Sequence, residues 1–262
     1  MADLEQRTEG GVLRITLNRP DAKNALTPDQ RDEIIATLDA ASDDPDVRAI
    51  VISGSGGSFC SGADLRASRP ATRERVQGDV ARLIATGAQR LIASILDCEK
   101  PIVASVDGVA AGIGAHIAFA SDLVIASEDA RFIEIFVRRG LVPDGGGAYL
   151  LVRLIGPQKA KELIFFGGDV HAADAREMGL VNCVVPASDL EAATTEWATR
   201  LAAGPTRTIA IAKKLINSAH DVDRAAAFHD EAWAQELNMG TEDATEGVKS
   251  FVERREPDFK GR

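Results

Sequence analysis

Residues 107–126, DGVAAGIGAHIAFASDLVIA, indicate the fold because they place a glycine-punctuated turn between two apolar segments. Gly112 and Gly114 bracket Ile113 where a strand is expected to give way to a short helix. Backbone N–H groups at such a junction gain from the helix dipole. The turn is therefore predicted to bind an anion or to form an oxyanion site.

Strands and helices are predicted to alternate along most of the chain. A capping box at Thr27 and Gln30, with proline at the first helical position, starts a helix that is expected to end near Ala41. Beyond Gly145 the pattern is almost wholly helical. Strands are expected at residues 12–17, 47–53, 102–106, 123–126 and 131–133, and one long amphipathic helix at residues 71–97. This alternation predicts an α/β fold.

Composition argues against several classes of partner. The 262 residues carry 40 acidic and 30 basic side chains and a net charge of −10, so nucleic acid and anionic membrane surfaces are repelled. The most apolar stretch, residues 101–126, contains Asp107, His116 and Asp122, which are costly in lipid. The first ten residues lack the layout of a signal peptide. A cytoplasmic protein is expected, with no nucleic acid or membrane partner.

The three cysteines give no sign of a disulfide framework or a metal site. Cys60, Cys98 and Cys183 are odd in number, widely spaced and without a CxxC pair or a nearby histidine. They are expected to be structural thiols in a reducing compartment. No metal and no separate cofactor are expected.

A second glycine-rich segment lies at residues 54–65, GSGGSFCSGADL. Its small residues let the backbone approach a ligand closely and turn N–H groups toward an anion. It matches neither a phosphate-binding Walker loop nor a dinucleotide fingerprint. By itself it is equally well explained as a tight connection. If the two loops face each other, they supply two N–H donors to one oxygen, which suits a thioester carbonyl that becomes an enolate.

The sequence resembles the crotonase (enoyl-CoA hydratase/isomerase) superfamily. Two segments carry the likeness most clearly: SFCSGADL and residues 107–126, DGVAAGIGAHIAFASDLVIA. Three further segments occur in the order found in the family: VLRITLNRPDAKNAL, GLVPDGGGAYLLVRLIG and SFVERREPDF. The resemblance implies a ClpP/crotonase-like spiral of ββα turns over residues 1–200. It implies a helical trimerisation region over residues 201–262, with assembly as a homotrimer or as a hexamer of two trimers.

The same resemblance assigns the ligand-facing positions. Ala63 and Ile113 correspond to the two oxyanion donors. Coenzyme A, as part of an acyl-CoA thioester substrate, is expected along Arg19, Lys23, Ala25, Cys60, Ser61, Asp64 and Leu65. Arg19 and Lys23 offer local positive charge to its phosphates, although both also fit ordinary solvated cations. Arg254 is expected to reach a neighbour's ligand in the trimer.

The chain departs from the hydratases of this family, which use two glutamates to add water. His116 and Phe136 stand at those two positions. Asp144, in GLVPDGGG, stands where 1,2-epoxyphenylacetyl-CoA isomerases, the closest likeness, carry an acid. One carboxylate can take a proton from one carbon and return it to another, so Asp144 is the expected base of an isomerase. His116 is a second catalytic candidate.

Other interpretations of these residues stay open. Asp144 also fits a helix N-cap, and His116 also fits a packed, hydrogen-bonded histidine. Glu134 is a fallback acid but is expected to be an exposed carboxylate. The competing functions are a hydratase with an acid/base pair rebuilt from His116 and Asp144, a non-catalytic acyl-CoA binder, and a dehalogenase with Asp144 as nucleophile. The remaining histidines, His171, His220 and His229, are expected at the surface.

Overall fold

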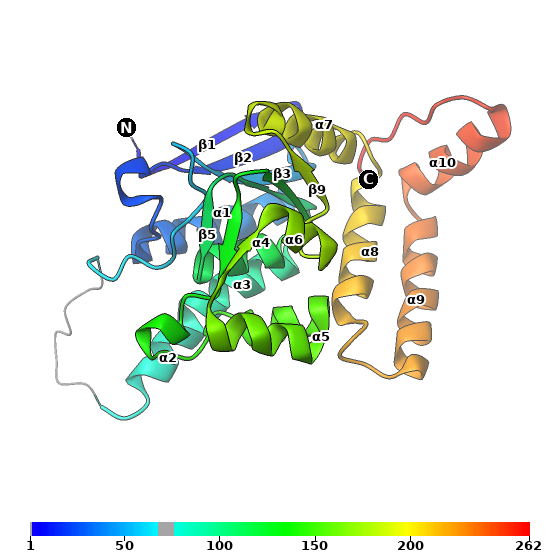
Figure 1. The fold of residues 1–262 in the computed structure, drawn as a ribbon. Helices are drawn as coiled ribbons and strands as arrows, with labels where there is room; N and C mark the ends of the chain where they lie inside the picture. Colours follow the sequence, from blue (N-terminus) through cyan, green and yellow to red (C-terminus); the bar gives the residue numbers. More distant parts are fainter. Residues whose placement is uncertain (1, 68–75) are drawn as a thin grey trace.

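The computed structural model describes residues 2–67 and 76–262 (Figure 1). Its described strands form a six-stranded sheet in the order β1-β2-β3-β4-β6-β9 and a three-stranded sheet in the order β5-β7-β8. The larger sheet contains β1 (Leu4–Glu9), β2 (Val12–Leu17), β3 (Ala49–Gly54), β4 (Ile102–Val106), β6 (Leu123–Ser127) and β9 (Cys183–Val185). The smaller contains β5 (Val109–Ala111), β7 (Arg131–Ile133) and β8 (Asp169–His171).

The chain spirals by stepping repeatedly from the large sheet to the small one. After the antiparallel β1–β2 hairpin, the remaining strands of the large sheet pair in parallel. β4 passes directly into β5, and β6 into β7, and each of these pairs is followed by a helix. The predicted spiral of ββα turns is thus the architecture of the protein.

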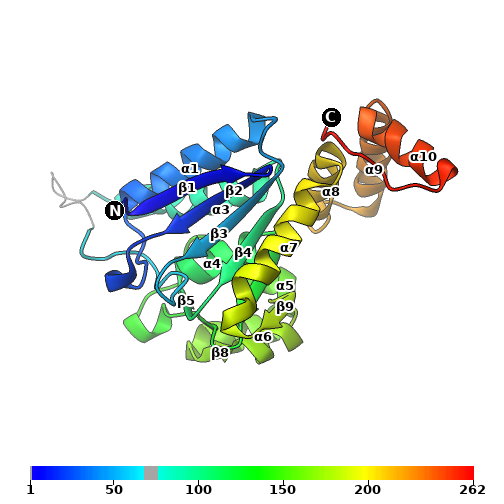
Figure 2. The same ribbon diagram turned by 90° about the horizontal axis from the view of Figure 1, so that it is seen from above.

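Helices cover both faces of the large sheet (Figures 1 and 2). The main core lies on the face with α1 (Pro28–Asp43), α3 (Ala88–Asp97), α4 (Ile113–Ala120) and α6 (Ala172–Glu177). On the other face, α7 (Leu190–Ala202) packs Ala198 against Val51, Val103 and Ile125. Short 3-10 helices occupy Pro20–Ala22, Val137–Arg139 and Ala187–Asp189. The capping box of α1 is confirmed, with Thr27 accepting from the backbone N–H of Gln30.

The single helix predicted over residues 71–97 is wrong. The described part contains α2 (Asp79–Thr86) and α3 separated by Gly87, and residues 71–75 lie outside the described residues. Gly87 has φ −110° and ψ −95°, outside the helical range, so the chain bends there, and a Cβ at this position would lie 2.7 Å from the carbonyl oxygen of Leu83. As a result α2 leaves the core, and Val80 and Leu83 are exposed instead of packed.

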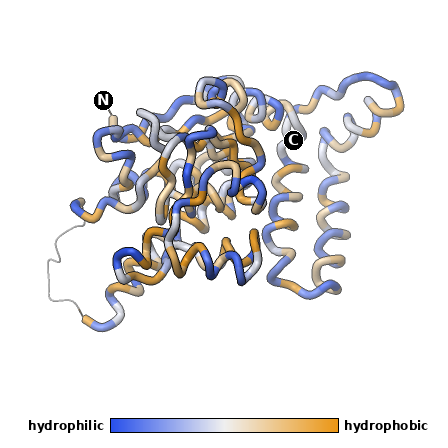
Figure 3. Tube along the Cα trace, in the orientation of Figure 1, coloured by the Kyte–Doolittle hydropathy of each residue, from blue (hydrophilic) through white to orange (hydrophobic). Residues whose placement is uncertain are grey.

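The last helices stand beside the body (Figures 1 and 2). α5 (Gly147–Phe166) is interrupted at Gly156, next to Pro157, and is followed in the chain by β8, α6, β9 and α7. α8 (Thr206–Ser218), α9 (Arg224–Met239) and α10 (Glu242–Glu253) then form the C-terminal group. Hydropathy alternates along α8 and α9 (Figure 3). Among the described residues, no helix combines the length and apolarity needed to cross a membrane.

Candidate active site

The two glycine loops lie against each other. The N–H of Cys60 donates to the carbonyl of Val109 at 2.9 Å, and the N–H of Ala111 donates to the carbonyl of Cys60 at 2.9 Å. A Cβ added at Gly114 would collide with the carbonyl oxygen of Cys60. Glycine at 114 is therefore required for this close approach, and the first loop is joined to the strand and helix start of the second.

Both proposed oxyanion donors have their N–H groups unused. On either side of Ala63 the backbone is fixed by hydrogen bonds: the N–H of Leu26 donates to the carbonyl of Gly62 at 2.8 Å, and the N–H of Asp64 donates to the carbonyl of Leu26 at 2.9 Å. Ile113 is the first residue of α4, where a helix leaves its N–H groups without intrahelical acceptors. In the hydrogen bonds of the described residues, neither the Ala63 nor the Ile113 N–H has an acceptor. Both can donate to a ligand oxygen.

The residues expected along coenzyme A are brought together by pairing of residues 19–26 with the first loop. The N–H of Ser61 donates to the carbonyl of Lys23 at 3.0 Å. Arg19 lies 2.9 Å from Asp64 and donates to the carbonyl of Ala25 at 2.7 Å. Hydrogen bonding from Arg19 holds the pKa of Asp64 below its usual value. The Arg19 charge is therefore partly balanced within the protein, while Cys60 is buried and Leu65 is 61% exposed.

Asn24 is a structural residue of this region that sequence reasoning missed. Its side chain is 1% exposed and donates to the carbonyls of Ser55 at 2.9 Å and Ser58 at 2.6 Å, and its oxygen accepts from the N–H of Arg19. Its φ of 54° is in the left-handed region, which asparagine tolerates. In the sequence, only its place beside the expected ligand residues pointed to it. Its role in joining residues 19–26 to the first glycine loop depends on how these two segments pack together in the fold.

Asp144 is not the N-cap of α5. The helix is capped by Gly146, and no side-chain cap hydrogen bond is present. Burial raises the pKa of the Asp144 carboxyl, while the nearby His116 lowers it and Glu134 raises it by smaller amounts. The carboxyl is therefore partly dehydrated, which favours its uncharged form more than water does. This environment is typical of a general base or acid.

The turn that carries Asp144 rests on the start of α4. A Cβ at Gly145 would lie 2.7 Å from Cδ1 of Ile113 and 3.4 Å from Nδ1 of His116. Gly145 has a φ of 54° and Gly146 one of 82°, so a glycine-specific backbone sets this turn. The structure thus places the turn of Asp144 beside both the oxyanion candidate Ile113 and His116.

His116 and Glu134 form a buried pair under this turn. The side chain of His116 is 0% exposed and that of Glu134 is 3% exposed, with Nε2 of His116 3.1 Å from Oε1 of Glu134. The His116 ring stacks on Phe136 at a centroid distance of 5.5 Å. The expectation that Glu134 is an exposed carboxylate is therefore wrong. The chain after β7 runs beneath α4, so residues 134 and 136 both face His116.

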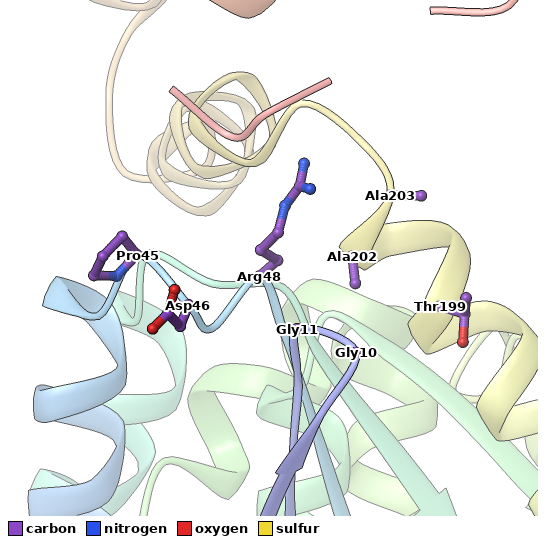
Figure 4. Close-up of a pocket in the computed structure, with 8 residues that line it drawn as sticks. All are labelled: Gly10, Gly11, Pro45, Asp46, Arg48, Thr199, Ala202 and Ala203. Atoms are coloured by element: carbon purple, nitrogen blue, oxygen red, sulfur yellow. The ribbon is translucent and has the colours of Figure 1, made fainter. Parts of the chain in front are cut away.

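A shallow pocket lies away from these residues (Figure 4). It measures about 400 Å³ and is lined by Gly10, Gly11, Pro45, Asp46, Arg48, Thr199, Ala202 and Ala203. Its lining residues come from the segments just before β2 and β3 and from the end of α7, whereas the first glycine loop follows the end of β3. Arg48 there donates to the carbonyls of Gly204 and Phe259, which ties the C-terminal segment to the body. We assign this cavity to structure and not to chemistry.

The described residues contain no cluster of three or more His, Cys, Asp or Glu side chains arranged to hold a metal ion. Cys60 and Cys98 are buried and unpaired, and burial raises the pKa of Cys60 to about 11, so its thiol is a poor nucleophile at neutral pH. His171, His220 and His229 are exposed, as expected. The chemistry on offer is backbone hydrogen bonding combined with proton transfer by carboxyl and imidazole groups.

Comparison with known proteins identifies the family of the chain. The family model described as enoyl-CoA hydratase/isomerase matches residues 7–262. The chain is 34% identical to the 2,3-dehydroadipyl-CoA hydratase of Escherichia coli (strain K12), with all of both chains covered. It is 32% identical to the 1,2-epoxyphenylacetyl-CoA isomerase of the same strain, with 97% of each chain covered.

A solved structure of an enoyl-CoA hydratase/isomerase from Cupriavidus metallidurans CH34 superposes with a TM-score of 0.92 at 32% identity, covering 100% of this chain and 97% of that one. The match of the family model over almost the whole chain and the shared spiral of ββα turns agree with each other. The chain therefore belongs to the enoyl-CoA hydratase/isomerase family of the crotonase superfamily.

Proposed function

We propose that the protein is an enoyl-CoA isomerase in which Asp144 moves a proton between carbons of a CoA thioester. The observation that carries the proposal is the placement of Asp144, in a turn packed on Ile113, with a carboxyl pKa raised by burial. His116 and Phe136, which stand where hydratases of the family carry glutamates, argue against ordinary hydration. Hydration in those relatives needs two carboxylates, one to activate water and one to deliver a proton to carbon.

The proposed reaction needs one base and one oxyanion site. With a 3-enoyl thioester, the Asp144 carboxylate removes a proton from C2, and the electron pair moves to the thioester oxygen as a dienolate. The unused N–H groups of Ala63 and Ile113 donate to that oxygen. The Asp144 carboxyl then gives the proton to C4, and the electrons return to form the C2=C3 bond. His116 is the second proton-carrying group beside this turn.

Coenzyme A is proposed to lie along residues 19–26 and the first glycine loop. Pairing of these two segments through Ser61 and Lys23 builds a continuous surface that ends at Ala63. Lys23 is exposed there and is proposed to contact phosphate, because Arg19 already faces Asp64. The coenzyme enters as part of the substrate.

A hydratase with a rebuilt acid/base pair is the second candidate. The observation favouring it is the imidazole of His116, whose Nδ1 is buried without a hydrogen-bond partner and lies beside the turn of Asp144. In that reaction one of these groups deprotonates water and the other protonates carbon. The product would be a 3-hydroxyacyl-CoA.

The test is turnover of 3-enoyl-CoA, 2-enoyl-CoA and epoxyphenylacetyl-CoA by the wild-type protein and Asp144→Asn in D₂O. The proposal predicts isomerisation of 3-enoyl-CoA, with C4 receiving the proton from C2 or deuterium to the extent that the Asp144 proton exchanges with solvent. It predicts no 3-hydroxyacyl-CoA and a loss of about 10²- to 10⁴-fold in kcat for the variant. Asp129→Asn, an exposed acid in the β6–β7 turn, is the matched control and should keep wild-type kcat.

Other results identify the competing functions. A 3-hydroxyacyl-CoA product that depends on both His116 and Asp144 would establish the hydratase. Binding of acyl-CoA without turnover of any substrate would establish a binding protein, and a trapped ester at Asp144 would establish nucleophilic chemistry. Wild-type isomerisation by Asp144→Asn would refute Asp144 as the base.

A further inference from the structure

A buried carboxylate lies behind the candidate site and takes no part in the reaction as proposed above. Glu134 is 4% exposed, and both its oxygens approach Nε2 of His116, at 3.1 Å and 3.3 Å. In the hydrogen bonds of the described residues, this is the only partner of the Glu134 side chain. Burying a carboxyl with a single hydrogen-bond partner destabilises a fold, which indicates a functional role for this residue.

The geometry selects which nitrogen of His116 carries the proton. An ionised carboxylate only accepts hydrogen bonds, so Nε2 of His116 is the donor. The other nitrogen, Nδ1, is buried without a hydrogen-bond partner. A buried N–H without an acceptor is rarer and more costly than an unused acceptor lone pair. Nδ1 is therefore unprotonated in the resting state and offers a lone pair.

That nitrogen lies beside the turn that carries Asp144. Nδ1 lies 3.4 Å from the point that a Cβ of Gly145 would occupy, directly after Asp144. The ring is fixed on its other sides: Phe136 stacks on it with an interplanar angle of 12°, and Gly147 approaches so closely that a Cβ there would lie 2.6 Å from Cε1. His116 cannot turn its ring over without losing the Glu134 hydrogen bond.

We propose that Glu134 is a positioning residue, which holds His116 as the Nε2–H tautomer so that Nδ1 faces the Asp144 turn as a second proton acceptor. A proton passing from the Asp144 carboxyl to Nδ1 would leave an Asp144 carboxylate and an imidazolium beside the Glu134 carboxylate. No further reactant is needed. The inference rests on the proposed function, because it assigns the partner of the Asp144 base.

The test combines ¹⁵N NMR of ring-labelled histidine with steady-state kinetics on the full chain. His116→Gln assigns the His116 signals among the four histidines. In the wild-type protein at neutral pH, we expect a protonated Nε2 and an unprotonated Nδ1. An N–H at Nδ1, alone or together with one at Nε2, would overturn the inference. This measurement needs no variant of Glu134 and so does not depend on how such a variant folds.

Glu134→Gln keeps the shape but has an amide that can donate to Nε2, so part of the population should become the Nδ1–H tautomer. We expect kcat for 3-enoyl-CoA to fall at least about tenfold, as when the orienting carboxylate of a catalytic histidine is lost, with little change in KM. Glu128→Gln, which removes an exposed acid in the β6–β7 turn, should change neither readout.

A result in which kcat and the tautomer do not change together overturns the inference. A fall in kcat with an unchanged tautomer would mean a structural role for Glu134, and a changed tautomer with wild-type kcat would mean that Nδ1 carries no proton in turnover. Failure of the proposed function is distinguished by Asp144→Asn. If that variant isomerises at the wild-type rate, the base is wrong whatever Glu134 does.

Discussion

At the scale of single residues, the environment of Asp144 links activity to pH. Burial raises the pKa of this carboxyl. As a base it must be ionised, so kcat/KM should rise with pH through a pKa above the ordinary aspartate value of about 3.9. Glu128→Gln should keep the same profile. A profile of isomerisation that is flat across this acidic limb would contradict the assignment of Asp144 as the base.

The raised pKa of Asp144 also predicts that stability changes with pH in the opposite direction to activity. A carboxyl whose pKa is raised in the folded state favours folding when protonated, and that contribution is present below its unfolded pKa and lost as pH rises through the folded pKa. At neutral pH the ionised Asp144 is therefore unfavourable in the fold. Asp144→Asn should raise the Tm at pH about 7, and the gain should shrink toward pH about 4.

Thermal unfolding of Asp144→Asn and Asp129→Asn over this pH range checks the prediction. Asp129 is exposed, so its variant should follow the wild-type curve. A lower Tm for Asp144→Asn at neutral pH would mean that the carboxylate makes stabilising contacts in the fold. A catalytic residue is expected to behave in this way: its replacement raises the stability and lowers the turnover.

At the scale of elements, the first turn of α5 is shaped by the His116 ring. A Cβ at Gly147 would overlap Nε2 of His116 and lie 2.6 Å from Cε1. Gly147→Ala should displace the ring from Glu134, lower the stability by about 1–3 kcal/mol as overpacking does, and reduce kcat. Gly168→Ala, just beyond the C-terminus of α5, is the control because open space surrounds its Cβ.

Denaturant unfolding and 3-enoyl-CoA turnover of these two variants check this prediction. Wild-type turnover and stability in Gly147→Ala would show that the ring has room to move, which would weaken the case for a fixed tautomer. A loss in Gly168→Ala equal to that in Gly147→Ala would assign the effect to the helix and not to His116.

Local signals in the sequence predict elements whose causes are local. The α1 capping box depends on residues three apart, and it formed as expected at Thr27 and Gln30. The break at Gly87 lies in the backbone of that residue, and the apolar periodicity of residues 71–97 continues across it, so the periodicity did not reveal it. In the site, the position of Asp144 followed from a motif. The burial of Glu134 could not be predicted from the sequence, because it results from packing against α4, which lies elsewhere in the chain.

A buried cation is one of the contacts between α8 and the body. Lys213, with a side chain 6% exposed, lies 2.9 Å from Asp122 and donates to the carbonyl of Ile95. Burial raises the pKa of Asp122 and Lys213 lowers it, so loss of the lysine leaves a poorly compensated carboxyl. Lys213→Met should lower the stability by about 3 kcal/mol. Lys214→Met, on the exposed side of α8, should change it by less than about 0.5 kcal/mol.

Denaturant unfolding measures both variants, and hydrogen exchange shows where the loss occurs. Amides of α8 should exchange faster in Lys213→Met, since the lysine bonds that helix to the body, while amides of β3 and β4 should change less. Equal stability of the two variants would mean that apolar packing, and not the ion pair, holds α8 in place.

At the scale of the whole molecule, the C-terminal helices leave large apolar side chains uncovered. α9 exposes Phe228, Trp233 and Leu237 by 59–69%, and α10 exposes Phe251 by 84% and Val252 by 74%. Apolar surface gathered on neighbouring elements marks sites of association. The exposed side chains lie within residues 201–262, where the family resemblance implies a trimerisation region, so we propose that α9 and α10 form the contacts between subunits.

This proposal predicts the mass of the protein in solution and its dependence on one side chain. The wild-type protein should have the mass of a trimer or hexamer, and Phe251→Asp should shift it toward smaller species, because a desolvated charge in an interface is strongly unfavourable. Light scattering coupled to size exclusion measures the mass, with Glu128→Lys, a charge change at an exposed position of the β6–β7 turn and outside residues 201–262, as the control. A monomeric wild-type protein would refute the assembly. A Phe251→Asp variant that keeps the wild-type mass would place the subunit contacts on another face, and the exposed aromatic residues of α9 and α10 would then need a different partner.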